Sequence, residues 1–206
     1  MDFFHNLSKP EMEVQQHETV ISFFNDLGIA ENHSTYALEK LINADSRYLR
    51  DMKLNTQAVL NSSNLSKKEA YLLALATAIN EKNDILSKAF EALARNENAN
   101  DNEIAEVAAC VGVMATNNVF YRFRHYMHTV DFYDKQPAGL RMSVMMNPVL
   151  GKEFFELLSL ALSALNGCER CVTSHEASVK NHGASEARIF DAIRLVSVIK
   201  SLCVVL

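Results

Sequence analysis

Two cysteines and a histidine stand at a spacing that suits thiol redox chemistry. Cys168 and Cys171 form a C-x-x-C pair, and His175 follows the second cysteine by about one helical turn. Because residues three and four apart share one face of a helix, the three side chains are expected to lie along a single stripe. In a chain without an export signal, such a pair is typical of a redox or metal site rather than of a structural disulfide.

The residues before the first cysteine favour a reactive thiolate. Asn166 and Gly167 interrupt an apolar stretch, so a helix is expected to begin near Cys168. The unpaired N–H groups and the dipole of a helix N-terminus stabilise a thiolate, which is the reactive form of the thiol. Its position at the start of a helix alone therefore makes Cys168 the more acidic thiol. His175 is placed to take the proton of Cys171 or to pair with its thiolate.

Glu156 is the fourth candidate residue. It precedes Cys168 by twelve residues, which is about 18 Å along a straight helix and too far for contact. If the chain turns at Asn166 and Gly167, the helix that carries Glu156 can lie against the helix that carries the cysteines. A carboxylate beside the apolar LLSLALSAL run would then be a buried proton acceptor with a raised pKa.

The same residues admit plainer interpretations. The cysteine pair could be inert, or it could be half of a zinc site completed by His175 and His182. Zinc sites of that type usually use two separated pairs, whereas here all four groups crowd one helix. A haem attachment motif is excluded, because Val172 follows the second cysteine where that motif needs histidine.

The composition indicates that helices position these residues. The 206-residue chain has only 6 Gly and 3 Pro and is rich in Ala and Leu, which favours long helices and an all-α fold. With 49% hydrophobic residues, it can build a core without disulfides. Cys110 and Cys203 lie in apolar helical stretches and are expected to be small core residues.

Capping signals predict where the helices begin and end. Residues 1–33 are expected to form an N-terminal helical extension whose helix ends at Gly28, and residues 34–206 a single helical domain. Ser66 followed by Glu69 is a capping-box pattern that opens the helix KEAYLLALATAIN. Further helices are expected over residues 38–42, 104–127, 152–165, 168–183 and 186–202, and a loop over residues 134–139.

A faint internal repeat divides the domain. Residues 70–80 (AYLLALATAIN) align with residues 156–166 (ELLSLALSALN), which pairs Leu72 with Leu158. Both segments are followed by a polar break and a further helix, so a duplicated helical unit is suggested, and in this register the first copy lacks every candidate functional group. The two halves are a degenerate one at about residues 66–130 and a catalytic one at about residues 150–206.

Charge and apolar runs exclude several classes of function. The net charge is −5 with both signs interspersed, and the absence of a basic block argues against nucleic-acid binding. The apolar run at residues 157–165 is too short to cross a bilayer, and the start, MDFFHNLSKPE, lacks the pattern of a secretory signal. A cytoplasmic protein that binds neither nucleic acid nor membrane is expected.

The candidate residues resemble the signature of the alkyl hydroperoxidase D (AhpD) family, within the carboxymuconolactone decarboxylase-like superfamily. That signature is Glu, eleven residues, Cys-x-x-Cys, three residues and His, and Glu156, Cys168, Cys171 and His175 meet every spacing. The resemblance covers about residues 35–202. Further stretches similar to family members are RDMKLNTQAVL (50–60), NNVFYR (117–122) and PAGLRMSVMMNP (137–148).

The resemblance implies an all-α fold of two related halves, a homo-oligomer that is most often a trimer, and no tightly bound cofactor. It implies that Cys171, buried near Glu156 and His175, reacts with an organic hydroperoxide and becomes the sulfenic acid. The more exposed Cys168 would protonate the leaving alkoxide and then close the Cys168–Cys171 disulfide. The reductant would be a lipoyl group on a 2-oxoacid dehydrogenase component, and the reduced pair would regenerate a partner peroxiredoxin.

One residue departs from the pattern of some relatives, which carry a relay histidine between the two cysteines. This chain has Arg170 there, and arginine cannot act as a base near neutral pH. A relay must then use water or another side chain, although the charge of Arg170 could lower a thiol pKa. The replacement of histidine by Arg170 is expected to affect direct peroxide reduction more than disulfide exchange.

The sequence therefore predicts an antioxidant alkyl hydroperoxide reductase with a dithiol–disulfide cycle. A second hypothesis is a disulfide reductase relay with little peroxidase activity, in which Cys168 exchanges with partner disulfides. A third is a non-redox member of the superfamily, either a decarboxylase or lactone-acting enzyme or a binding module with incidental thiols.

Overall fold

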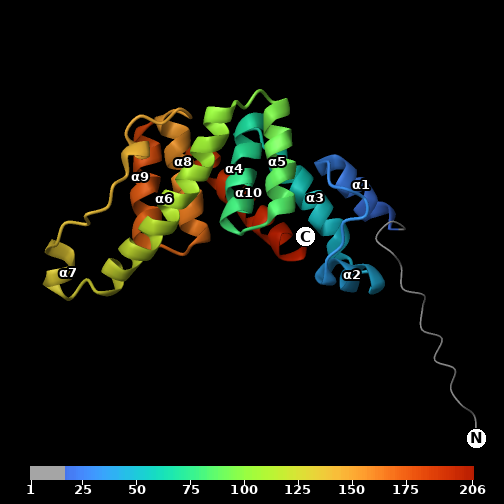
Figure 1. The fold of residues 1–206 in the computed structure, drawn as a ribbon, viewed down its shortest axis with the longest axis horizontal. Coiled ribbons are helices and arrows are strands. Elements are labelled where there is room, and N and C mark those ends of the chain that lie inside the picture. Colours follow the sequence, from blue (N-terminus) through green and yellow to red (C-terminus); the bar gives the residue numbers. More distant parts are fainter. Residues whose placement is uncertain (1–16) are drawn as a thin grey trace, which may run out of the picture.

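The computed structural model describes residues 17–206, and within that range it contains helices and no strand. The all-α prediction is confirmed. Figure 1 shows α6 starting beside α4 and running diagonally across α8 and α9, with α7 projecting beyond its far end. The helices are α1 (Glu18–Leu27), α2 (Tyr36–Asn43), α3 (Tyr48–Leu60), α4 (Lys67–Asn80), α5 (Asp84–Asn96), α6 (Asp101–Tyr126), α7 (Asp131–Lys135), the 3-10 turn η2 (Ser143–Met145), α8 (Lys152–Leu165), α9 (Glu169–Asn181) and α10 (Glu186–Val205).

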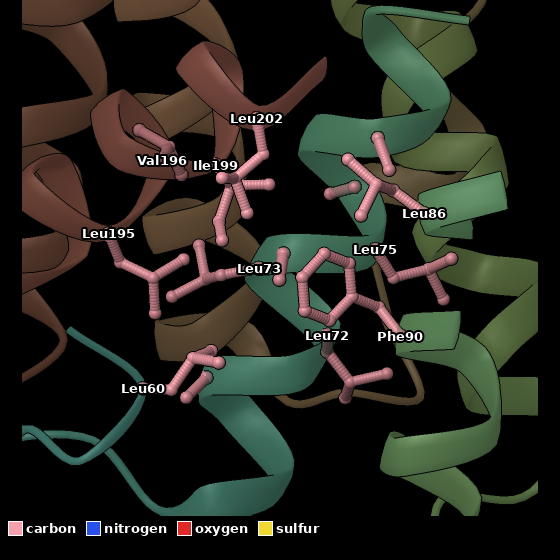
Figure 2. Close-up of a cluster of buried hydrophobic side chains, with 14 of the residues drawn as sticks. Leu60, Leu72, Leu73, Leu75, Leu86, Phe90, Leu195, Val196, Ile199 and Leu202 are labelled. Carbon is pink, nitrogen blue, oxygen red and sulfur yellow. The ribbon is translucent and has the colours of Figure 1, made fainter. Parts of the chain in front are cut away.

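The core forms where α4 packs between α5 and α10. Figure 2 shows Leu73 of α4 beside Leu195 and Ile199 of α10, with Leu86 and Phe90 of α5 on the other side. All five side chains are fully buried. Because α4 has neighbours on nearly every side, it is apolar around most of its circumference, and its sequence is a continuous Ala/Leu run rather than an amphipathic one.

The capping predictions hold at most helix ends. Ser66 and Glu69 form the predicted capping box at the start of α4, and Ser185 accepts from the Arg188 N–H at the start of α10. Gly28 ends α1 with φ of 69°. The loop predicted over residues 134–139 is wrong at its start, because α7 extends to Lys135.

The predicted N-terminal extension lies partly outside the described residues, since these begin at position 17. The part of the extension that the structure describes contains α1, which packs against α3 and α5 of the same chain. Phe23 and Phe24 are fully buried in that contact region. This helix therefore belongs to the main hydrophobic core.

Two helical hairpins occupy equivalent positions in the proposed halves, α4 with α5 and α8 with α9. Helices α4 and α8 both have 14 residues and begin at Lys67 and Lys152. These bounds pair Leu72 with Leu157, one residue away from the register of the sequence alignment. Asn83 and Cys168 then occupy the same position, because each is the N-cap of the second helix of its hairpin.

A partly buried ion cluster ties α10 to both hairpins. Arg188 donates to Glu153 of α8 (Nε to Oε1, 2.8 Å) and to Glu69 of α4 (Nη2 to Oε1, 2.6 Å). Its Nη1 also donates to the Asn64 carbonyl at 2.9 Å. Burial opposes the charge on this guanidinium, but its hydrogen bonds to the two carboxylates raise its pKa far above the usual range. The cluster fixes the start of α8, which carries Glu156, relative to α4.

Helix α6 is the one helix in residues 17–206 that is long and apolar enough to cross a membrane by length and composition alone. A core helix of a soluble protein passes the same test. α6 packs against α4, α8 and α9, although only 39% of its apolar window is buried within the chain. Much of its apolar surface is therefore left uncovered by this chain.

Candidate active site

The turn between α8 and α9 places the cysteine pair. Asn166 ends α8, Gly167 adopts φ of 67°, and Cys168 is the N-cap of α9. The left-handed conformation at Gly167 favours glycine, because a Cβ would crowd the backbone there. The predicted turn at these residues is confirmed, and α9 packs back against α8.

Asn166 fixes this turn to the neighbouring helices. Its Nδ2 donates to Asn118 Oδ1 of α6 at 2.9 Å, and its backbone carbonyl accepts from Arg122 Nη1 at 2.6 Å. Its side chain also exchanges hydrogen bonds with Asn80, the last residue of α4. The start of α9 is thus held by both hairpins and by α6.

Cys168 and Cys171 are joined by a disulfide with a Cα–Cα separation of 5.3 Å. Cys168 is 0% exposed and Cys171 is 6% exposed. The expectation that Cys168 is the more exposed cysteine is therefore wrong for this chain by itself. As the N-cap of α9, Cys168 lies at the base of the turn that Asn166 fixes to α4 and α6, whereas Cys171 lies one turn along and faces a cavity.

The predicted proximity of Glu156 and His175 is confirmed. His175 Nδ1 lies 2.7 Å from Glu156 Oε2, and the carboxylate is only 4% exposed. Lys152, one turn earlier on α8, approaches the other carboxylate oxygen, with Nζ 3.3 Å from Oε1. Glu156 thus bridges an imidazole and an ammonium group. Its contact with His175 fixes which imidazole nitrogen faces the carboxylate.

The pKa of Glu156 is shifted in the direction opposite to the prediction. Burial raises it, as expected, but the hydrogen bonds and charges of His175 and Lys152 outweigh burial and hold the pKa below the usual range. Glu156 is therefore a carboxylate at neutral pH. It can orient the His175 imidazole, as the aspartate of a catalytic triad orients its histidine.

A cavity of about 360 Å³ opens onto the inner cysteine. It brings together α6, the segment that contains η2, and α9. Its lining combines polar or reactive side chains with the apolar side chains of Tyr121, Met142 and Met145. Its lining residues are Asn117, Tyr121, Met142, Met145, Arg170, Cys171, Ser174 and His175.

Arg170 lies at the edge of this cavity. Its guanidinium Nη1 is 3.3 Å from Asp134 Oδ1, so it pairs with the end of α7. The side chain is about half exposed, and it joins the projecting α7 segment to α9. It is therefore engaged by a carboxylate at the cavity edge.

The structure does not bring His182 to the cysteines. It is the C-cap of α9, exposed, and its Nδ1 lies 2.8 Å from the Ser178 carbonyl oxygen. Within residues 17–206 no cluster of three His, Cys, Asp or Glu side chains suits a metal ion.

The remaining two cysteines have the predicted packing role in part. Cys110 is fully buried beside Ser159, and burial raises the pKa of its thiol to about 12. Cys203 is only partly buried, and its thiol pKa is also raised to about 12, chiefly by burial. Neither thiol is ionised near neutral pH.

Sequence reasoning missed Lys152 and Asn117 as site residues. Lys152 precedes Glu156 by four residues on one helix, so the i, i+4 spacing was a usable signal. Lys152 Nζ also donates to the Met145 carbonyl at 2.7 Å, which links the carboxylate to the cavity wall. For Asn117, only the similarity of the NNVFYR stretch to family members pointed to the region.

Comparisons with known proteins find relatives of this chain. The carboxymuconolactone decarboxylase family matches residues 133–203. The chain is similar to the alkyl hydroperoxide reductase AhpD of Anaeromyxobacter dehalogenans (strain 2CP-C), at 41% identity over 170 residues that cover 82% of this chain and 90% of that protein. It is also similar to AhpD of Azorhizobium caulinodans (39% identity; 77% and 87% covered) and of Streptomyces coelicolor (36%; 82% and 94%).

The similarity extends well beyond the cysteine motif, because each alignment covers most of both chains. The family expected from the spacing of Glu156, Cys168, Cys171 and His175 is therefore confirmed. This chain belongs to the AhpD family of the carboxymuconolactone decarboxylase superfamily.

Proposed function

We propose that the protein is an alkyl hydroperoxide reductase that cycles Cys168 and Cys171 between dithiol and disulfide. The observation that carries the proposal is the cavity shared by Cys171 and His175, whose imidazole is bonded at 2.7 Å to the buried Glu156. A thiol, a base and a group that orients the base are the parts that an activated nucleophile needs. The relatives' names state the same activity for those proteins.

In the reduced enzyme, His175 takes the proton of the Cys171 thiol. The thiolate attacks the hydroxyl oxygen of the hydroperoxide, so an S–O bond forms, the O–O bond breaks, and an alkoxide leaves with a proton from Cys168. The sulfur is now a sulfenic acid. The Cys168 thiolate then attacks that sulfur and the disulfide closes. The departing hydroxide takes the proton that His175 accepted from Cys171 and leaves as water.

Reduction is proposed to begin at Cys171, because the cavity opens onto Cys171 and Cys168 is fully buried. An incoming thiolate would attack the Cys171 sulfur and release Cys168, whose place at the N-terminus of α9 makes it a good leaving thiolate. We assign the reductant to a lipoyl group on a 2-oxoacid dehydrogenase component in the cytoplasm, with a peroxiredoxin as a further acceptor of electrons. The lipoyl group is a narrow chain that ends in a dithiol, so it can enter a cavity of this size.

We further propose a homotrimer. Large apolar side chains are exposed on α6, on α7 and in the segment between α7 and α8, and Figure 1 shows α7 projecting from the rest of the chain. Exposed apolar surface larger than scattered single residues marks an interaction site, and we propose that these residues form one. The exposed residues there are Val119, Phe123, Tyr126, Phe132, Tyr133, Met146 and Val149.

The test is a coupled assay with a lipoylated domain, lipoamide dehydrogenase and NADH, supplied with cumene hydroperoxide. Cys171→Ser is expected to reduce hydroperoxide consumption to background, because the nucleophile is lost. Cys168→Ser should leave a sulfenic acid on Cys171 that a dimedone probe labels. Cys203→Ala, which removes a thiol away from the cavity, should retain full turnover. Undiminished turnover in Cys171→Ser would contradict the proposal.

Adding an oxidised peroxiredoxin to the same assay distinguishes the peroxidase from a disulfide relay. A pure relay would oxidise NADH only when the peroxiredoxin is present. Decarboxylation or lactone turnover that survives both cysteine substitutions would instead support a non-redox enzyme.

A further inference from the structure

Asn117 on α6 is a buried polar side chain without a good partner. It is 5% exposed, it lines the cavity with Cys171 and His175, and its Oδ1 has no hydrogen-bond partner. Its Nδ2 contacts only the Met142 sulfur, at 3.0 Å, and a thioether is a weak acceptor. Exchanging the two amide atoms does not change this, since one end would still face sulfur and the other would lack a partner.

The adjacent asparagine shows the contrast. Asn118 donates to Ser163 Oγ at 2.9 Å and accepts from Asn166 Nδ2 at 2.9 Å. It therefore has donors and acceptors satisfied within the helix bundle and holds the α8–α9 turn. Asn117 makes no comparable hydrogen bonds to the helix bundle. Leaving its amide unpaired in a buried position costs folding free energy. A buried polar group of this kind at a cavity is explained by a ligand that completes its hydrogen bonds.

We propose that Asn117 binds the hydroperoxide and orients it toward Cys171, an inference that rests on the proposed function. The Asn117 Oδ1 accepts a hydrogen bond from the hydroperoxide O–H, which presents the hydroxyl oxygen to the Cys171 sulfur. The organic group lies against the sulfur-containing side chains of Met142 and Met145 and the ring of Tyr121, which line the same cavity. That oxygen keeps its proton during transfer, so the same hydrogen bond stabilises the sulfenic acid hydroxyl.

This role does not require a titrating group. Asparagine is neutral at all relevant pH values, so Asn117 acts by position while His175 and Glu156 handle the proton. The apolar lining residues Tyr121, Met142 and Met145 define the substrate class as hydroperoxides that carry an organic group. Hydrogen peroxide would make the Asn117 contact without the contacts to Met142 and Met145.

The test compares Asn117→Leu with the wild-type enzyme in the full chain. Leucine has a similar volume and removes both polar atoms. We expect kcat/KM for cumene hydroperoxide to fall about tenfold, which is the loss of one hydrogen bond to the substrate. The rate at which dithiothreitol reduces the Cys168–Cys171 disulfide should not change. The same substitution at an exposed helical position, Asn55→Leu, serves as the control and should change neither rate.

The stability of Asn117→Leu should not fall with its activity, which gives a second measurement. Because the leucine removes an unpaired buried amide, the urea midpoint of Asn117→Leu should equal or exceed that of the wild type. A lower midpoint together with parallel losses in both half-reactions would show a structural role and overturn the inference. Unchanged hydroperoxide kinetics in an active enzyme would overturn it as well. A wild-type chain that consumes no hydroperoxide would remove the proposed function and this inference together.

Discussion

Glu156 carries its charge deep in the chain because it contacts the imidazole of His175 and the ammonium group of Lys152. At the scale of single residues, this makes its pKa lower in the folded chain than in the unfolded one, where it is near 4.5. The carboxylate therefore adds to stability at all pH values above about 4.5, and this contribution is lost as the pH falls through the lowered folded pKa.

Glu156→Gln should make this contribution visible. The free energy of unfolding, measured in urea from about pH 7 to about pH 3, should be lower in the variant at neutral pH, and the difference should shrink below about pH 4.5. Hydroperoxide turnover should fall roughly 100-fold, the usual scale for loss of acid–base support. Glu176→Gln, at a partly exposed position on α9, should change stability by less than about 0.5 kcal/mol. A gap between wild type and Glu156→Gln that widens in acid would contradict the pKa direction.

The sequence predicted which side chains meet, but not their electrostatics. The contact between His175 and Glu156 follows from the helical stripe and the turn at Gly167, both of which are local signals. The direction of the Glu156 pKa depends on Lys152 as well, and burial alone gave the wrong sign. The exposure of Cys168 was also predicted wrongly, because burial at the turn comes from α4 and α6, which are distant in sequence.

At the scale of elements, the turn between α8 and α9 determines where the cysteines lie. Gly167→Ala should destabilise the protein by roughly 1–2 kcal/mol, the cost of a left-handed residue with a Cβ. Because the strained turn also carries Cys168, hydroperoxide turnover should fall with stability. Gly28→Ala is a matched control, since Gly28 has nearly the same φ (69° against 67°) but ends α1.

The two variants should lose similar unfolding free energy, measured by urea denaturation, while only Gly167→Ala loses activity at temperatures where both are folded. Equal activity in the two variants would show that the turn geometry does not matter to the site. Gly167→Asn should recover part of the stability, because asparagine tolerates this conformation better than alanine.

Most helices could be predicted because their ends carry strong local signals. The capping box of Ser66 and Glu69, the cap at Ser185 and the glycine after α1 each fix a boundary through nearby hydrogen bonds. Helix α7 was missed because five residues give too little periodicity to detect. The cavity could not be predicted at all, since its walls come from α6, the η2 segment and α9.

At the scale of the whole molecule, the α6–α7 region is the proposed interface of the homotrimer. Tyr126→Asp combined with Phe132→Asp should convert the proposed trimer to a monomer, because charge is costly in a buried apolar interface. Sedimentation velocity measures the outcome. Phe190→Asp is the matched control: Phe190 of α10 is 65% exposed, against 64% for Phe132, and should leave the assembly intact. A wild-type monomer, or a trimer that survives the double substitution, would contradict this interface.

The most direct test of the central claim is a single-turnover reaction of the fully reduced protein with one equivalent of cumene hydroperoxide. Mass spectrometry would quantify the Cys168–Cys171 disulfide, and chromatography the alcohol product. The dithiol cycle predicts that one disulfide and one molecule of alcohol form per chain, at the same rate. Alcohol that forms while both cysteines stay reduced, or a hydroperoxide that persists beside the reduced pair, would contradict it.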